Sequence, residues 1–201
     1  MKRELFIATS YHHVITAITY PYTIIFSIIV IMIMLLSPEL LWIMGGDYYV
    51  QAKYCLPPII VGLVCQFIYS FYINAEFYLK KQIRIAIGTI LAASINILLN
   101  IFLVPKFGYV IASYTTLAGY IILLLFHFFS LVFLGKQDWY DNRFNCFIIL
   151  GFIALIPIMC FVYQYDLLRY RLIIILGSAI IMFIYIKKDK AIGLIKKITH
   201  K

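Results

Sequence analysis

Long apolar runs alternate with short polar segments along the whole chain. Six runs approach or exceed the roughly 20 residues that an α-helix needs to cross the hydrocarbon core of a bilayer. The runs are residues 14–36, 56–78, 83–104, 109–134, 144–163 and 172–186. The last run is short, and we expect it to extend backward past Arg171, whose long side chain can reach the interface. The pattern predicts an all-α integral membrane protein, a six-helix bundle that forms one domain over residues 1–201.

Composition supports the same class of protein. Hydrophobic residues make up 65% of the 201 residues and charged residues only 12%, which excludes a soluble globular domain. The net charge of +9 is therefore not taken as a sign of nucleic-acid binding. Its distribution instead predicts topology, because basic residues gather in cytoplasmic loops of membrane proteins.

The basic residues favour one orientation. With the amino terminus in the cytoplasm, thirteen of them face inward, including six lysines in the tail at residues 187–201. The four that face outward are Lys53, Lys106, Arg169 and Arg171. We therefore expect both termini in the cytoplasm, and we expect the tail to be a basic cytoplasmic segment that can rest on anionic lipid.

Polar and small residues recur at helical spacing in four of the six spans. Residues three or four positions apart share one face of a helix, so each set forms a stripe. In the first span the stripe consists of Thr16, Tyr20, Thr23 and Ser27. In the second span it consists of Gly62, Gln66, Ser70 and Asn74. These stripes fit the lining of a water-filled pathway as well as they fit helix packing. The candidate substrate-pathway residues on them are Tyr20, Thr23, Gln66, Ser70 and Asn74.

The stripes of the third and fourth spans contain more small residues. They consist of Gly88, Ala92, Asn96 and Asn100, and of Gly108, Ala112, Thr115 and Gly119, with Thr116, Tyr120 and His127 on an adjacent face. Small residues let helices approach closely, and amide and hydroxyl side chains join them by hydrogen bonds. We expect packing roles for Asn96 and Asn100, with a pathway role as the alternative for these residues and for Thr116. For His127 we expect a satisfied interior or interface position, with a proton-linked role as the alternative.

Glu76 is the acidic residue that falls inside a predicted span. It lies about one turn from the cytoplasmic end and four residues before Lys80, which predicts an ion pair on one helix face. An intramembrane carboxylate is also a functional candidate in its own right. Both interpretations remain open from the sequence.

No residue pattern predicts catalysis, a metal site or a cofactor. The chain has no paired-carboxylate motif, nucleophile elbow, P-loop or set of ligands with metal spacing. Its four cysteines lie within or beside apolar runs, where they act as small hydrophobic residues. They are Cys55, Cys65, Cys146 and Cys160. We therefore expect a protein that is not an enzyme.

Residues 80–120 carry a recurrent pattern. A basic loop precedes a helix that ends Asn-x-x-x-Asn, and then come Pro-x-Phe-Gly and a helix rich in small residues and Thr. This segment resembles the bacterial flippases that move lipid-linked oligosaccharides, which share a superfamily with the multidrug and toxin extrusion transporters. The resemblance extends over nearly the whole chain, which looks like the second six-helix half of a twelve-helix flippase.

The resemblance implies a function and partners. Such proteins carry an undecaprenyl-pyrophosphate-linked sugar repeat across the inner membrane for O-antigen or capsule, by alternating access between two six-helix lobes. It implies that the first two spans face the central cavity and that the missing first lobe is a partner. Lys80, Lys81 and Arg84 are the candidates for the pyrophosphate, although topology explains these cations equally well.

Two other functions stay open. Half of a multidrug exporter shares the superfamily fold, although the lack of a convincing cluster of buried acids argues against it. The third possibility is an inactive truncated remnant, which is favoured by the loop-like start at residues 1–13. A split-gene half that pairs with a separate first half gives the same sequence pattern.

Overall fold

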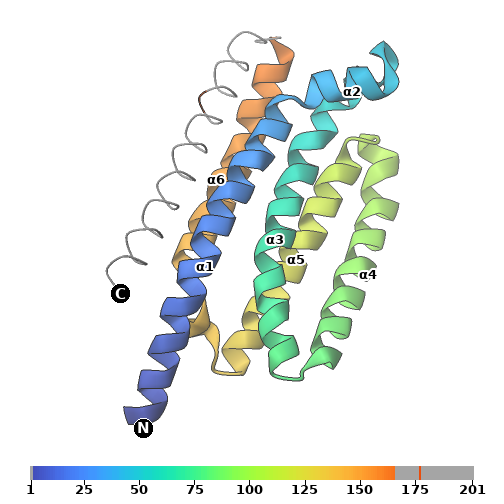
Figure 1. Ribbon diagram of the computed structural model, residues 1–201. Helices are drawn as coiled ribbons and strands as arrows, with labels where there is room; N and C mark the ends of the chain where they lie inside the picture. Colours follow the sequence, from blue (N-terminus) through green and yellow to red (C-terminus); the bar gives the residue numbers. More distant parts are fainter. Residues whose placement is uncertain (1, 166–176, 178–201) are drawn as a thin grey trace.

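The computed structural model describes residues 2–165 and residue 177. In that part of the chain every regular element is a helix, and five segments are long and apolar enough to cross a membrane (Figure 1). The five segments are Ile15–Leu35, Asp47–Tyr78, Gln82–Phe107, Ile111–Phe133 and Asn142–Gln164. The prediction of an all-α membrane bundle is thereby confirmed. The predicted span at 172–186, apart from Gly177, and the tail at 187–201 lie outside the described residues.

The helices follow the predicted spans closely, with shifts at their ends. The α-helices are α1 (Lys2–Leu35), α2 (Ser37–Gly45), α3 (Leu56–Tyr78), α4 (Gln82–Phe107), α5 (Ile111–Phe133) and α6 (Asn142–Gln164). Two 3₁₀ segments, η1 (Asp47–Cys55) and η2 (Gln137–Trp139), connect them. Helix α1 begins well before the predicted apolar run, and α4 continues through Pro105 instead of ending at Val104.

The turns show why the long helices end where they do. Gly108 and Gly135 take positive φ angles of 82° and 64°, which glycine adopts without steric cost, and each follows the end of a long helix. Lys80 also has a positive φ, of 56°, in the turn between α3 and α4. At the start of α6 the Asp141 side chain caps the helix, accepting a hydrogen bond from the Phe144 N–H at 3.0 Å.

Helix α3 is the centre of the bundle. It packs against α1, α5 and α6, and half of its most apolar segment is buried within the protein. Its residues Val61, Val64, Cys65 and Ile68 are at most 1% exposed. Apolar side chains of α5 and α6 complete the core around them. The sequence places polar groups on α3 as well, so the central helix brings those groups to its neighbours.

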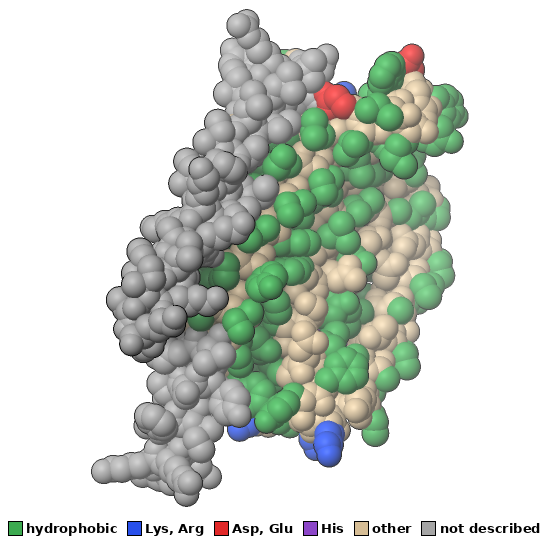
Figure 2. All heavy atoms as spheres, in the orientation of Figure 1, with side chains coloured by type: hydrophobic (Ala, Val, Ile, Leu, Met, Phe, Trp, Pro, Cys, Tyr) green, Lys and Arg blue, Asp and Glu red, His purple; other side chains and the backbone are tan. Residues whose placement is uncertain are grey.

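Helix α4 lies at the edge of the bundle and packs mainly against α5 (Figure 1). Most of its large aliphatic side chains are exposed, among them Ile87, Ile90 and Ile101. Figure 2 shows hydrophobic side chains over the visible face, with most visible Lys and Arg at one end and Asp and Glu at the opposite end. An apolar belt between two charged ends is the surface expected of a membrane-spanning bundle.

Candidate functional site

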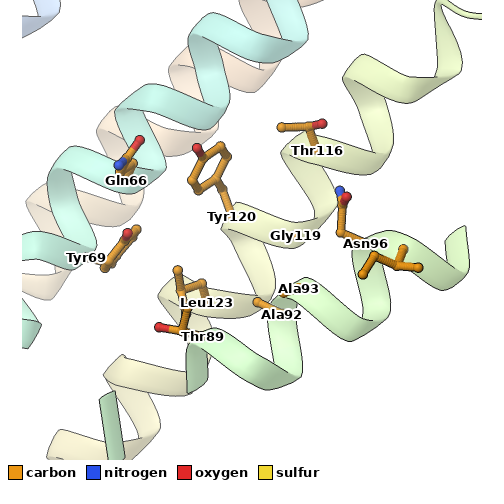
Figure 3. A pocket seen from close by; sticks show the side chains of 11 residues that line it. Gln66, Tyr69, Thr89, Ala92, Ala93, Asn96, Thr116, Gly119, Tyr120 and Leu123 are labelled. Carbon is orange, nitrogen blue, oxygen red and sulfur yellow. The ribbon is translucent and has the colours of Figure 1, made fainter. Parts of the chain in front are cut away.

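A groove opens between α3, α4 and α5, at the level of the membrane-spanning segments. Its volume is about 400 Å³, and its walls mix hydroxyl and amide groups with small and apolar side chains (Figure 3). The polar lining residues are Gln66, Tyr69, Thr89, Asn96, Thr116 and Tyr120. This is the size range of pockets that hold small ligands, and its polar groups can both donate and accept hydrogen bonds.

Small residues on α4 and α5 leave room for the groove. Gly119 and Ala92 lie where the two helices approach, and a Cβ at Gly119 would be 3.5 Å from Asn96. On the other wall, a Cβ at Gly62 would be 2.8 Å from the Tyr120 ring, so the glycine makes space for that ring. Figure 3 shows Gln66 of α3 and Tyr120 of α5 pointing toward one another. The groove thus forms where glycine and alanine leave space that larger apolar side chains would fill.

The two asparagines join α4 to α5. The Asn100 Nδ2 donates to Asn96 Oδ1 at 3.0 Å, and the Thr115 hydroxyl donates to Asn100 Oδ1 at 2.6 Å. The hydrogen bond between helices that the sequence predicts is therefore present at Asn100. Asn96 has a second role, because it also lines the groove.

The α3 stripe divides into residues with different surroundings. Gln66 lines the groove, while the Ser70 hydroxyl donates to the Phe67 carbonyl of its own helix at 2.6 Å. Asn74 is exposed and lines none of the described pockets. Of the three polar residues in the α3 stripe, only Gln66 therefore lines the groove, and the second α3 residue in its wall is Tyr69, which lies off the stripe.

The α1 candidates lie away from this groove. The Tyr20 hydroxyl donates to Asp141 Oδ2, the residue that caps α6, and the Tyr20 ring packs on Phe144 at 4.5 Å. Thr23 is 1% exposed, and its hydroxyl has no hydrogen-bond partner among the described residues. The described groove is thus lined by the second, third and fourth spans and not by the first, so of the two spans that the resemblance places at the cavity only the second lines it.

Glu76 requires a correction. The sequence predicts an ion pair with Lys80, but the Glu76 carboxyl lies 2.9 Å from Nδ1 of His127, and both side chains are 0% exposed. Lys80 leaves the α3 helix at the turn, where its positive φ carries it off the face that holds Glu76. The expected interior position of His127 is what the structure shows, and its partner is an acid on another helix.

The basic candidate residues lie at the end of the bundle where α3 connects to α4. Lys80 and Lys81 are exposed in the turn between α3 and α4. Arg84 is half-buried, and its Nη1 donates to the Ser130 hydroxyl at 3.2 Å and to the Ser130 carbonyl at 3.3 Å. Arg84 therefore has a role in joining α4 to the end of α5.

Two polar residues of the groove, Tyr69 and Thr89, lie outside the polar stripes that the sequence predicts. Thr89 lies seven residues before Asn96 and so shares its helix face, a spacing that would have identified it. Tyr69 lies three residues after Gln66, but aromatic residues are frequent in every span of this chain, so its identity alone carries little information.

The fold and the groove define the chain as a multi-pass membrane protein. No protein-family model and no solved structure matches it. A 69-residue segment is 36% identical to a protein of Methanocaldococcus jannaschii described as "Uncharacterized membrane protein MJ1068". The match covers 34% of this chain and 14% of that protein, so the chain matches about a seventh of the relative's length.

Proposed function

We propose that this chain is the second half of a flippase that moves undecaprenyl-pyrophosphate-linked oligosaccharides across a bacterial inner membrane. The observation that carries the proposal is the groove between α3, α4 and α5. A chain that only anchors itself in lipid has no need of six hydroxyl- or amide-bearing residues around one intramembrane groove, since polar groups there are costly.

The chemistry of the groove fits a sugar. Saccharide hydroxyls both donate and accept hydrogen bonds, and so do the amides of Gln66 and Asn96 and the hydroxyl of Tyr120. The Thr116 hydroxyl donates to the Ala112 carbonyl at 2.8 Å, so it is available as an acceptor. None of the groove residues is charged, which suits the neutral part of a lipid-linked saccharide. The exposed Lys80 and Lys81 at the end of α3 are the cations that this function assigns to the pyrophosphate.

The function requires a second lobe. Alternating access depends on two bundles that move against each other around the site, and the resemblance assigns this chain to one of them. We therefore propose a first-half six-helix bundle as its partner, with both termini of this chain in the cytoplasm.

Complementation tests this proposal. The chain is expressed with a matching first half in a strain that lacks its oligosaccharide flippase, and surface polymer is measured on gels. Restored polymer supports the flippase, and expression of the chain alone, which we expect to restore none, is the control. Absence of polymer despite both halves in the membrane would contradict the proposal.

A second function, half of a drug exporter, is favoured by one observation. The buried Glu76 carboxyl is an ionisable group inside the bundle, and such groups mark ion pathways in transporters. In that case the same co-expression would raise resistance to toxic cations and leave surface polymer absent.

A further inference from the structure

The pair formed by Glu76 and His127 has features that packing alone does not explain. The two residues lie on different helices, α3 and α5, and both are fully enclosed at 0% exposure. Besides the 2.9 Å contact between Oε2 and Nδ1, the second polar atom of each side chain, Glu76 Oε1 and His127 Nε2, has no hydrogen-bond partner in the described part of the chain. Leaving buried polar atoms unpaired is unfavourable, so this arrangement calls for a physical explanation.

The unpaired atoms favour one protonation state. If the pair were a carboxylate and an imidazolium, the unpaired Oε1 would share a negative charge and the unpaired Nε2–H a positive one. Charged groups without partners are far more costly to bury than neutral ones. If Glu76 is protonated and His127 is neutral, the acid O–H donates to Nδ1, and the unpaired atoms are only a neutral carbonyl and a neutral N–H.

Neighbouring groups do not supply a compensating charge. On α3 the Tyr69 ring stacks on the imidazole at 5.7 Å between centroids, with an angle of 16°. From α4, Arg84 is directed to Ser130 on the next turn of α5. Lys80 and Lys81 are exposed in the turn. Among the described residues, His127 is the group that contacts the Glu76 carboxyl within salt-bridge distance.

Helix α4 covers the pair on the Nε2 side. A Cβ at Gly88 would be 3.3 Å from His127 Nε2 and 2.6 Å from the Phe126 ring, so α4 approaches this closely because residue 88 is glycine. The Tyr69 ring, which stacks on the face of the imidazole, also lines the groove. A small movement of α4 away from α5 would therefore open Nε2 first.

We propose that Glu76 and His127 form a buried proton-binding site that holds one exchangeable proton on the Glu76 carboxyl, donated to His127 Nδ1, with α4 at Gly88 as its cover. The site goes beyond the proposed flippase function and does not depend on which substrate the groove takes. A proton stored between α3 and α5 beside the groove is suited to responding to movements of α4 relative to α5.

Infrared spectroscopy of the purified chain in lipid nanodiscs tests the protonation state. At neutral pH we expect a protonated-carboxyl band that disappears in Glu76→Gln, remains in the matched control Glu39→Gln, and shifts in His127→Gln. Labelling glutamate with ¹³C in the unaltered chain should shift the same band, which assigns it to a glutamate. The chain has two other glutamates, Glu4 and Glu39, so a band that remains in Glu4→Gln and in Glu39→Gln belongs to Glu76 even if Glu76→Gln does not fold. Absence of such a band, or a band unaffected by His127→Gln, would overturn the site.

Hydrogen–deuterium exchange of the same band tests the cover. Gly88→Ala places a methyl group against Phe126 and His127, so we expect the band to exchange several-fold faster than in the unaltered chain. Gly151→Ala adds the same methyl group on α6, where nothing lies within 4 Å, and should leave the exchange rate unchanged. Equal rates in both variants would overturn the role of α4. The measurements need no transported substrate, so their outcome is separate from that of the complementation experiment.

Discussion

The Thr115 hydroxyl donates a hydrogen bond of 2.6 Å to Asn100 Oδ1 and thereby joins α5 to α4 inside the membrane-spanning bundle. Thr115 is 2% exposed, so the bond is shielded from solvent. Helix α4 has few buried side chains of its own, so this bond is a specific link between it and α5, while the contact of Asn100 with Asn96 lies within α4 and orients the Asn100 amide.

Removing this bond should loosen α4. We expect Thr115→Val and Asn100→Leu each to lower the free energy of unfolding in detergent, with a coupling of about 0.6 kcal/mol between them, the average for hydrogen bonds between transmembrane helices. Denaturant titration of the two single variants and the double variant measures the coupling. Strict additivity would show that the bond contributes nothing to stability.

Substitutions of Gln66 and of Asn74 should differ in their effect on transport. The sequence places both on one stripe, but the structure brings only Gln66 into the groove. In the co-expression system, Gln66→Leu should reduce surface polymer while protein level in the membrane stays the same, because Leu cannot bond a sugar hydroxyl. Asn74→Leu is the matched control and should transport normally. Equal loss in both variants would mean that the groove is not the pathway.

Tyr20 and Asp141 should act on stability. The Tyr20 hydroxyl bonds the same carboxyl that caps α6. Asp141→Ala removes the cap and this bond together, so it should cost about 1 kcal/mol or more of unfolding free energy. Tyr20→Phe keeps the cap and should cost less. A Tyr20→Phe chain that is fully stable yet fails to transport would return Tyr20 to the pathway.

Tyr140 should make the fold sensitive to alkaline pH. This residue lies in the connection between α5, which ends at Phe133, and α6, which begins at Asn142. Its hydroxyl donates to the Phe71 carbonyl at 2.7 Å. Burial, with a smaller contribution from Tyr72, raises the pKa of Tyr140 from 10.0 to about 12. Since the folded state holds this proton more tightly, its stabilising effect is complete below pH 10 and is lost as pH rises toward 12. Unfolding followed over that range should show a steeper loss in the unaltered chain than in Tyr140→Phe.

The orientation of the bundle can be measured with reporter fusions. The α3–α4 turn and the α5–α6 connection lie at one end of the bundle, and η1 and the α4–α5 turn at the other (Figure 1). Fusions after Lys81 and Lys136 should report a cytoplasmic position, and a fusion after Lys106 an external one, because basic residues gather inside. An external signal after Lys81 would reverse the proposed topology.

The sequence predicted the fold class and most of the spans because both depend on local properties. Apolar runs of sufficient length must form helices in lipid, where every backbone polar group needs a partner within its own segment. The run at 56–78 has the same bounds as α3. The end of α4 was less predictable. Pro105 removes one backbone hydrogen bond, which favours an end at Val104, yet the helix continues for its last turn to Phe107.

The candidate site was only partly predictable. Helical spacing shows which residues share a face, and it correctly groups Asn96 with Asn100 on the side that meets α5. Spacing does not show which face of one helix meets which face of another. The groove therefore includes Tyr69 and Thr89 and excludes Asn74, a choice that depends on the packing of α3 and α4 on either side of α5.

Glu76 illustrates the division best. The sequence of the chain shows that this ionisable group lies inside an apolar segment, where it needs a partner. The nearest candidate along the chain was Lys80, four residues away. Only the tertiary structure decided that the partner is His127, which is 51 positions distant, because the packing of α3 against α5 brings the two side chains within 2.9 Å. The apolar segments of the sequence show which polar groups will be buried and need partners, and the packing of the helices determines which partners they find.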